Sequence, residues 1–439
     1  MSNPTLSDPY IRHLLQISDE EAERLKAAEH AGVIEFAPVT LPDPEERNNH
    51  LGWPVSALVD DTLVVVHRHI PRHWKGSTET DDTTSFSWVV RSTDGGQTWS
   101  TPYDLRDAMS KEDRYRGGHI PLSHRYKFAT EQDPDLGYKL HLNSMVATPD
   151  GGVVVACNYG IFRSDDKGKT WEHFPEAFRE DTMPGPIVYL GPKAFNHPDR
   201  GIVLVGHSAI GLYPHDVERS TNSSVIDDFL HVRWSLDGGR TWEAQDEPMP
   251  SVVKPGEPCP LWHDGNFIII ARSYDDASVT VIDGEECMRY IQLWSRDGWF
   301  PFEHRHTTIR VAGKETGWGT QDTMDVDFNP VSGRLEVVTP NRAGGGPGSL
   351  EDGRQTLNLW SIDAEAMLSG DADWSFEGTL LRRADAKRTV DGMHPGGAVI
   401  DRERGMQHIF IYLGFPEGPA GAFRLSRTLD TDALREYLI

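Results

Sequence analysis

STDGGQTW at residues 92–99 recurs as SDDKGKTW at residues 164–171 and as SLDGGRTW at residues 235–242. The three copies share the pattern S-x-D-x-G-x-T-W, and the two intervals between them are nearly equal. Self-similarity at a fixed period is typical of repeat architectures, in which each repeat is one supersecondary unit. The sequence therefore predicts a chain built from similar units rather than a single irregular domain.

Weaker copies of the same octapeptide extend the series. Residues 294–298 (WSRDG) and 360–363 (WSID) keep part of the pattern, and residues 424–427 (RLSR) stand where a further copy would fall. Each repeat has room for about four short strands, the size of one blade of a β-propeller. We therefore predict an all-β fold, a six-bladed β-propeller. The serines that mark the six positions are Ser92, Ser164, Ser235, Ser295, Ser361 and Ser426.

The octapeptide has the chemistry of a hairpin turn. Its Asp can accept hydrogen bonds from nearby backbone N–H groups, its Gly permits a positive φ, and its Trp can pack beside the sheet. This motif resembles the Asp-box, or BNR repeat, of sialidase-like β-propellers. In that family the box joins the two outer strands of a blade, on the face away from the active site. The resemblance therefore implies a fold and leaves the activity to other residues.

Composition limits the class of protein. The formal net charge is −25, which argues against nucleic acid or an anionic membrane as a general partner. Three cysteines provide no disulfide framework, and no apolar run is long enough to span a membrane. The chain lacks a secretory signal pattern. From these features we expect a cytoplasmic protein.

Two segments precede the first repeat. Residues 1–32 contain a capping box at residues 18–21 and apolar residues at helical spacing, and they predict an N-terminal helical extension. Residues 33–40 read as a strand that would join the last blade and close the ring. The expected domain division is therefore 1–32 for the extension and 33–439 for a single β-propeller.

Polar side chains recur where inner strands are expected to begin and second strands to end. In a propeller these strand ends meet at one rim of the central tunnel, so the side chains there form the default site hypothesis. The residues that we expect to bind substrate are Asn49, His69, Asn143, His207, Arg272, Arg342 and His394.

Histidine, tyrosine and arginine in such a set suit β-elimination at a uronic acid. One group must neutralise the substrate carboxylate, a base must remove the α-proton, and an acid must protonate the leaving oxygen. The expected partner is therefore an anionic oligosaccharide or polysaccharide.

NNHLGWP at residues 48–54, followed by VVVH at residues 64–67 and WVVR at residues 88–91, is similar to the start of the propeller in ulvan-lyase-like polysaccharide lyases. In those lyases two first-blade histidines, a tyrosine and an arginine carry the reaction. The resemblance implies catalytic roles for His50 and His67. Tyr159 and Arg163 are the candidates for the other two roles, with Arg342 as a second candidate for the carboxylate partner.

Two other classes stay open. An exo-sialidase or another retaining glycosidase would share the fold, although the expected arginine motif and tyrosine nucleophile are not evident in this sequence. A non-catalytic glycan-binding propeller is the other alternative.

No nucleotide-binding motif is present, so no nucleotide cofactor is expected. A structural zinc or calcium ion is a further hypothesis. Cys259 and His263, spaced Cys-x-x-x-His, are its candidate ligands.

Overall fold

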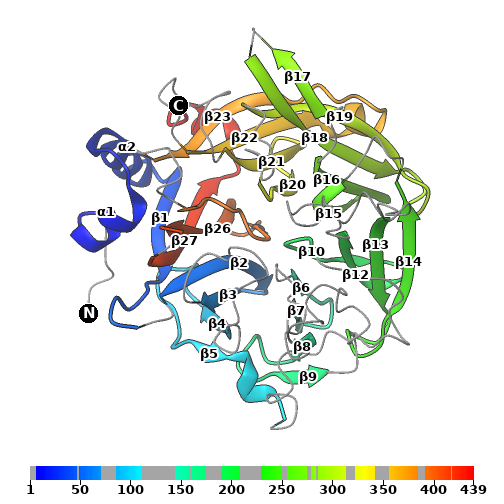
Figure 1. The fold of residues 1–439 in the computed structure, drawn as a ribbon, viewed down its shortest axis with the longest axis horizontal. Helices are drawn as coiled ribbons and strands as arrows, with labels where there is room; N and C mark the ends of the chain where they lie inside the picture. Colours follow the sequence, from blue (N-terminus) through cyan, green and yellow to red (C-terminus); the bar gives the residue numbers. More distant parts are fainter. Residues whose placement is uncertain are drawn as a thin grey trace, which may run out of the picture.

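Antiparallel β-sheets arranged in a ring make up most of the chain (Figure 1). The computed structural model describes residues 6–46, 49–70, 86–110, 144–157, 160–174, 189–207, 229–249, 255–273, 278–282, 285–312, 322–341, 355–383, 391–416 and 418–439. The predicted all-β propeller arrangement is confirmed, and the helices of the described residues are short segments at the edge of the ring.

Four sheets follow one another along the middle of the chain. The first is formed by β6 (Ser144–Ala147), β7 (Val153–Cys157), β8 (Gly160–Ser164) and β9 (Glu172–Phe174). The second contains β10 (Tyr189–Leu190), β11 (Phe195–His197), β12 (Gly201–His207), β13 (Phe229–Ser235) and β14 (Glu243–Pro248). The third contains β15 (Pro255–His263), β16 (Asn266–Ser273), β17 (Val279–Ile282), β18 (Glu285–Ser295) and β19 (Glu303–Ala312). The fourth contains β20 (Asp325–Asn329), β21 (Arg334–Asn341), β22 (Thr356–Asp363) and β23 (Ser375–Arg382).

The two ends of the chain share a nine-stranded sheet. Its N-terminal part is β2 (His50–Val59), β3 (Thr62–Ile70), β4 (Phe86–Ser92) and β5 (Tyr103–Asp104), followed by the 3₁₀-helix η2 (Leu105–Ala108). Its C-terminal part is β24 (Asp391–Gly392), β25 (Val399–Asp401), β26 (Met406–Gly414) and β27 (Ala420–Thr428). Only one pair of residues in the described register, His50 and Ala420, joins the two parts, and this pairing is parallel.

The N-terminal segment packs on the last strands of the ring. Two helices, α1 (Pro9–Leu15) and α2 (Asp19–His30), precede β1 (Ile34–Thr40), which pairs antiparallel with β27 (Figure 1). Ser18 caps α2 by accepting a hydrogen bond from the backbone N–H of Glu21, as the capping box predicts. Two further short helices are α5 (Ala364–Leu368) and α6 (Thr431–Arg435). Because β1 covers the edge of β27, the start and the end of the chain are tied together.

Each Asp-box forms a turn held by its own side chains. In the first copy, the Ser92 hydroxyl donates to Asp94 at 2.7 Å, and the backbone N–H of Thr98 donates to the same carboxylate at 2.9 Å. Burial opposes ionisation of this carboxyl, but hydrogen bonds from Thr98 and Ser92 lower the pKa of Asp94 to about 2. The turn therefore depends on contacts within eight residues, which is why the sequence alone identifies it.

The tryptophans of the second and third boxes pack between neighbouring sheets. Trp171 lies in a buried cluster with Val64 of β3 and Phe162 of β8. Trp242 lies in the next cluster with Val154 and Leu204. Burying a large aromatic side chain stabilises the folded state by roughly 2–3 kcal/mol. The repeated octapeptide thus supplies both the turn and the contact between successive sheets.

A buried charged network crosses the middle of the ring. The Lys193 ammonium donates to Asp325 and Asp327, each at 2.8 Å. The backbone N–H of Ala398 donates to the second oxygen of Asp325 at 2.8 Å, and the Gln407 amide donates to Asp327 at 2.9 Å. These five residues belong to three different sheets, so the network fixes the sheets relative to one another.

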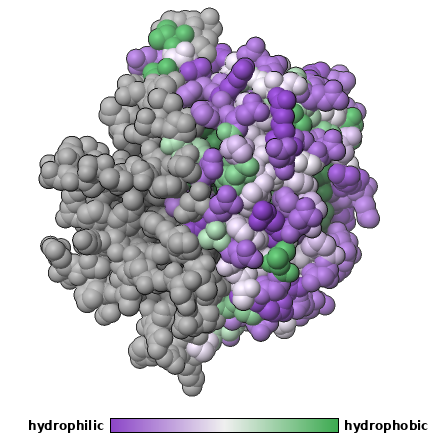
Figure 2. Space-filling model, turned by 90° about the vertical axis from the view of Figure 1, so that its right-hand side faces the viewer, coloured by the Kyte–Doolittle hydropathy of each residue, from purple (hydrophilic) through white to green (hydrophobic). Residues whose placement is uncertain are grey.

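The described surface visible in Figure 2 is mostly hydrophilic. On the face shown in Figure 2, hydrophilic residues predominate among the coloured atoms and hydrophobic ones are scattered between them. Within the part of the chain that the structure describes, no helix is long and apolar enough to cross a membrane.

Candidate functional site

Strand ends from several sheets converge at one edge of the ring, which we call the rim. At this edge β2 begins opposite the end of β3, where His50 pairs with Ile70, and β15 begins opposite the end of β16, where Gly256 pairs with Arg272. The Asp-boxes follow β4, β8 and β13, at the opposite ends of the strands. The rim is therefore the edge where the sequence analysis places the active site.

Two carboxylates and one guanidinium form the centre of the rim. Arg272 Nη1 lies 2.6 Å from Glu257 Oε2 and 4.0 Å from Asp322 Oδ1. Glu257 is carried by β15, Arg272 by β16, and Asp322 comes just before β20 of the next sheet. All three side chains are almost completely buried, with exposed fractions of 10%, 7% and 0%. Buried ion pairs of this kind depend on good geometry, so the arrangement is held firmly.

A histidine extends this centre toward the C-terminal strands. His394 Nδ1 lies 2.8 Å from Asp322 Oδ1, and because an ionised carboxylate is only an acceptor, this nitrogen carries the proton. The Thr323 hydroxyl donates to Glu257 at 3.0 Å, and the Thr323 backbone N–H donates to Asp322 at 2.8 Å. Among the described residues, the buried Nε2 of His394 has no hydrogen-bond partner. The carboxylate therefore orients an imidazole whose second nitrogen is available as a base.

Aromatic rings form the next part of the rim. The His394 ring stacks on Tyr412 at 5.2 Å, and Trp53 lies 5.6 Å from Tyr412 between ring centroids. His50 lies 5.4 Å from Tyr412, and the Arg68 guanidinium lies 6.0 Å from the Trp53 ring. Aromatic rings beside a few convergent polar groups are typical of small-ligand sites.

Unusual backbone conformations occur at this same edge. Trp53 and Glu257 have φ values of 47° and 46°, and Met393, next to His394, has a φ of 74°. For bulky residues other than glycine such angles are strained, at a cost of order 1–3 kcal/mol each. Trp53 and Glu257 both lie within β-bulges, where the pairing register shifts between Gly52 and Val55 and between Gly256 and Cys259. Strain of this kind clusters at functional sites, which supports the assignment of the rim.

His207 and Tyr290 hold the backbone of Glu257 and Asp322 through hydrogen bonds. The backbone N–H of Glu257 donates to His207 Nδ1 at 2.9 Å, so this nitrogen is unprotonated. Burial, together with His231 and Arg272, lowers the pKa of His207 well below its usual value. The Tyr290 hydroxyl donates to the backbone carbonyl of Asp322 at 2.9 Å, and burial raises its pKa. Both groups stay neutral at physiological pH and act as fixed supports.

The structure brings several predicted residues to the rim. His50, His207, Arg272 and His394 lie in or beside the cluster just described. The backbone carbonyl of Asn49 accepts a hydrogen bond from Ala420. His69 lies on the same face of β3 as His67, 3.5 Å from Glu46 and packed on Trp88 with the ring centroids 3.9 Å apart, so its predicted role in the rim cluster is not supported. Three predicted site residues, Tyr159, Asn143 and Arg342, lie outside the described residues.

His67 is placed away from this cluster. Its Nε2 lies 3.1 Å from the Thr40 hydroxyl of β1, its ring is completely buried, and it is two residues from His69 on β3. Because side chains alternate along a strand, His67 faces the same side as Val65, toward β1 and β27. The predicted catalytic role of His67 is therefore not supported; the side chain connects β3 to β1.

Burial predicts a pH effect at His67. Burial of the ring lowers the pKa of His67 to about 4, below the value of about 6.5 expected in the unfolded chain. The unfolded state then binds the proton more readily, so stability is retained above pH 6.5 and lost as the pH falls toward 4. We expect His67 to contribute roughly 3 kcal/mol of this loss. Urea unfolding at pH 7 and pH 4 would measure it.

A His67→Gln variant is the control, because the glutamine amide can still bond Thr40 and does not titrate in this range. The variant should lose less stability between pH 7 and pH 4 than the parent protein. An identical loss in both proteins would contradict the assignment of His67 as the titrating group.

Arg163 lies at the opposite edge, so its predicted catalytic role needs correction. Its guanidinium donates to Asp165 at 2.6 Å, to Asp150 at 2.7 Å and to the Gly238 carbonyl at 3.1 Å. Gly238 belongs to the third Asp-box. Arg163 therefore joins two neighbouring sheets on the Asp-box face and lies apart from the rim.

The proposed metal pair also needs correction. Cys259 and His263 are four residues apart on β15, so their backbones are separated by ~13 Å. Burial raises the pKa of the Cys259 thiol, and His263 stacks on Phe328 at 4.0 Å. One ion cannot bind both side chains. Among the described residues no group of three or more His, Cys, Asp or Glu side chains is arranged to hold a metal ion.

Several rim residues were not selected from the sequence. Glu257, Trp53 and Tyr412 lie in the cluster, and none of the three is among the predicted site residues. Glu257 is the most important of them for the chemistry. Its only local signal is the segment Pro-Gly-Glu-Pro at residues 255–258, at the start of an inner strand. Proline and glycine on both sides of an acidic residue indicate a bulge, which could have suggested this position.

Comparisons with known proteins agree with the fold. Residues 90–101 match the family described as BNR/Asp-box repeat. A Dyadobacter fermentans protein of unknown function superimposes with a TM-score of 0.54 at 14% identity, covering 89% of this chain and 98% of the other. An α-L-arabinofuranosidase of Fusarium graminearum gives 0.53 at 13% identity, covering 91% and 99%. A Hadza microbial sialidase gives 0.52 at 16% identity, covering 89% and 68%.

At these levels of identity the likeness shows a shared fold, a β-propeller. No curated protein matches the sequence.

Proposed function

We propose that this protein is a carbohydrate-active enzyme that hydrolyses a glycosidic bond at the rim. The observation that carries the proposal is that Glu257 and Asp322 both lie within 4.0 Å of one guanidinium nitrogen of Arg272. Glycoside hydrolysis requires a pair of carboxyl groups, one as the acid and the other as the nucleophile or base. Similar propellers include an arabinofuranosidase and a sialidase, which supports this class of reaction.

The spacing of the carboxyl groups favours retention of configuration. Retaining glycosidases hold the two groups about 5–5.5 Å apart, whereas inverting ones hold them about 6.5–9.5 Å apart. Since Glu257 Oε2 and Asp322 Oδ1 lie 2.6 and 4.0 Å from the same nitrogen, these oxygens are at most about 6.6 Å apart, a range that includes the retaining distance and reaches only the lower limit of the inverting one. The Trp53 ring, which packs on the fully buried Tyr412, would bind the apolar face of a sugar beside the two carboxyl groups.

A uronate lyase of the ulvan-lyase-like kind is the second candidate. The contact between His394 and Asp322 favours it, because the oriented imidazole could remove an α-proton. Elimination also needs a cation for the substrate carboxylate. Arg272 is already bound to Glu257, and the neighbouring Asp322 would repel an anionic sugar. These two contacts are the reason that we propose hydrolysis before elimination.

One assay separates these functions. The protein would be incubated with neutral and uronate-containing glycans, while reducing ends, free sialic acid and absorbance near 235 nm are followed together. We expect reducing ends without a rise in absorbance. A rise at 235 nm would replace hydrolysis by elimination, and no product from any glycan would favour a binding propeller.

We further propose that the chain forms six blades in one domain. The nine-stranded sheet divides naturally into β2–β5 and β24–β27 with β1, because one parallel pair alone joins these parts in the described register. Separate buried clusters lie between consecutive strand groups, as expected for blades that pack face to face. Residues 33–439 would then be the propeller, and residues 1–32 an extension packed outside it.

A further inference from the structure

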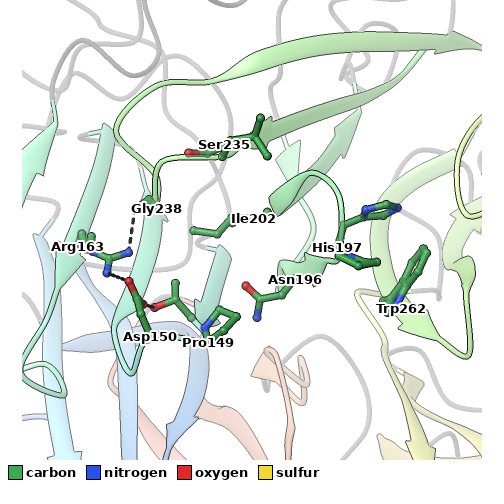
Figure 3. A pocket seen from close by; sticks show the side chains of 13 residues that line it. Pro149, Asp150, Arg163, Asn196, His197, Ile202, Ser235, Gly238 and Trp262 are labelled. Atoms are coloured by element: carbon green, nitrogen blue, oxygen red, sulfur yellow. Dashed lines mark hydrogen bonds and ion pairs between the residues drawn. The ribbon is translucent and has the colours of Figure 1, made fainter.

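A hollow lies on the Asp-box face, away from the rim. Its volume is about 590 Å³, within the range of small-molecule sites. Figure 3 shows Asp150 and Arg163 on one side and Asn196, His197 and Trp262 on the other. A neighbouring hollow of about 410 Å³ is also lined by Asn196 and Trp262. We call the two hollows together the far groove.

One wall of the far groove presents a carboxylate. Asp150 follows β6, and its side chain is 64% exposed although one oxygen accepts a hydrogen bond from Arg163 at 2.7 Å. Arg163 is only 5% exposed and also contacts Asp165, so its charge is compensated. The carboxylate is therefore fixed in position and keeps acceptor capacity toward the hollow.

The opposite wall presents an indole ring. Trp262 lies near the end of β15, and its ring contacts His197 at 4.4 Å and stacks parallel to Phe195 at 6.2 Å. His197 is held in turn by the Gly298 carbonyl at 3.2 Å. A Cβ atom on Gly298 would approach the Trp262 ring to 2.6 Å, so the backbone packs directly against the indole. The ring is thus rigidly supported, yet it remains only partly buried.

Asn196 completes the groove between these walls. Its Nδ2 donates to the Ala147 carbonyl at 2.8 Å, which fixes the carboxamide. Asn196 and Trp262 line both hollows, so the two hollows are adjacent. Together they offer room for a ligand longer than one sugar ring.

We propose that the far groove binds a neutral oligosaccharide. A sugar offers an apolar C–H face to an indole and hydroxyl donors to a carboxylate and an amide, which are the groups found here. An anionic sugar is disfavoured, since Arg163 is already compensated by Asp150 and Asp165 and the exposed carboxylate of Asp150 would repel it. The proposal does not depend on hydrolysis at the rim, because the two sites share none of the residues discussed.

Binding measurements on single variants test this proposal. Isothermal titration calorimetry would use maltotriose, cellotriose, xylotriose, mannotriose and arabinotriose, with a tri-uronate as the charged comparison. We expect one neutral trisaccharide to bind, and Trp262→Ala and Asp150→Ala each to weaken that binding at least tenfold. Asp150 is largely exposed, so its variant should fold even if the Trp262 variant does not.

Changes at the rim provide the matched control. Trp53→Ala and Glu257→Gln should leave the Trp262-dependent binding unchanged, whether or not the protein hydrolyses any glycan. The proposal is overturned if no neutral trisaccharide binds, or if the Trp53 change abolishes all binding while the Asp150 change has no effect. Stronger Trp262-dependent binding of the tri-uronate would overturn the neutral assignment.

Discussion

Replacing Glu257 by glutamine is expected to lower kcat about 10³-fold on any glycan that the protein hydrolyses. Glutamine keeps the shape of the side chain and can still contact Thr323, but it can neither ionise nor carry the catalytic proton. Asp322→Asn should have an effect of similar size, because the proposed reaction needs both carboxyl groups. Steady-state kinetics with the glycan found in the assay would measure both effects.

The pH dependence of kcat/KM gives a sharper test than the loss of activity alone. Two catalytic carboxyl groups produce a bell-shaped profile, and each variant should lose one limb of it. A residue that only supports the fold would lower the whole curve without changing its shape. Full activity in Glu257→Gln would contradict the proposed site.

Glu35→Gln is the matched control for this experiment. Glu35 of β1 forms an ion pair of 3.0 Å with the buried Arg424, is itself 41% exposed, and lies outside the rim cluster. This variant should keep the activity of the parent protein. A large loss of activity in Glu35→Gln would mean that removing the carboxylate partner of a buried arginine is enough to reduce activity, and the loss in Glu257→Gln would then not identify a catalytic group.

The fold could be predicted because its signal is local. Each Asp-box is a turn held by contacts within eight residues, such as those of Asp94 with Ser92 and Thr98. The strand that closes the ring could also be read from its apolar pattern, and β1 does pair with β27. These features depend on short-range chemistry, which a single sequence contains in full.

The site was harder to predict because it depends on strand register. His67 and Arg68 are neighbours on β3, yet one contacts Thr40 and the other lies over Trp53. A shift of one residue exchanges the two faces of a strand, and the bulge between Gly52 and Val55 makes such a shift. Whether a side chain near a strand end reaches the rim therefore depends on the register of its strand, which its position in the sequence does not give.

The central groups of the rim also come from distant parts of the chain. Glu257, Asp322 and His394 belong to three separate sheets, and no local motif connects them. Arg272 and His394 were selected for their position at strand ends, but the partners that give them a chemical role appear only once the sheets are assembled.

Replacing Lys193 by methionine is expected to lower the free energy of unfolding by about 3–5 kcal/mol at pH 8. In the parent protein, Asp325 and Asp327 each lie 2.8 Å from the Lys193 ammonium. The change leaves both carboxylates buried without this shared cation. Burial already raises the pKa of Asp325 to about 7, against the attraction of Lys193, and loss of the lysine would raise it further. Urea unfolding of parent and variant at pH 8 and pH 5 would measure the difference.

The sign of the pH effect identifies the mechanism. In the variant, the folded-state pKa of Asp325 lies above its unfolded value, so the protonated folded state is favoured at low pH and this stability is lost as the pH rises. The destabilisation should therefore be smaller at pH 5 than at pH 8.

Lys167→Met is the matched control, because Lys167 also contacts two aspartates, Asp60 at 2.8 Å and Asp61 at 3.3 Å, but on the surface. It should change stability little at either pH, since exposed ion pairs are screened by water. An equal loss in both lysine variants would show that burial of the central network contributes nothing beyond the ion pairs themselves.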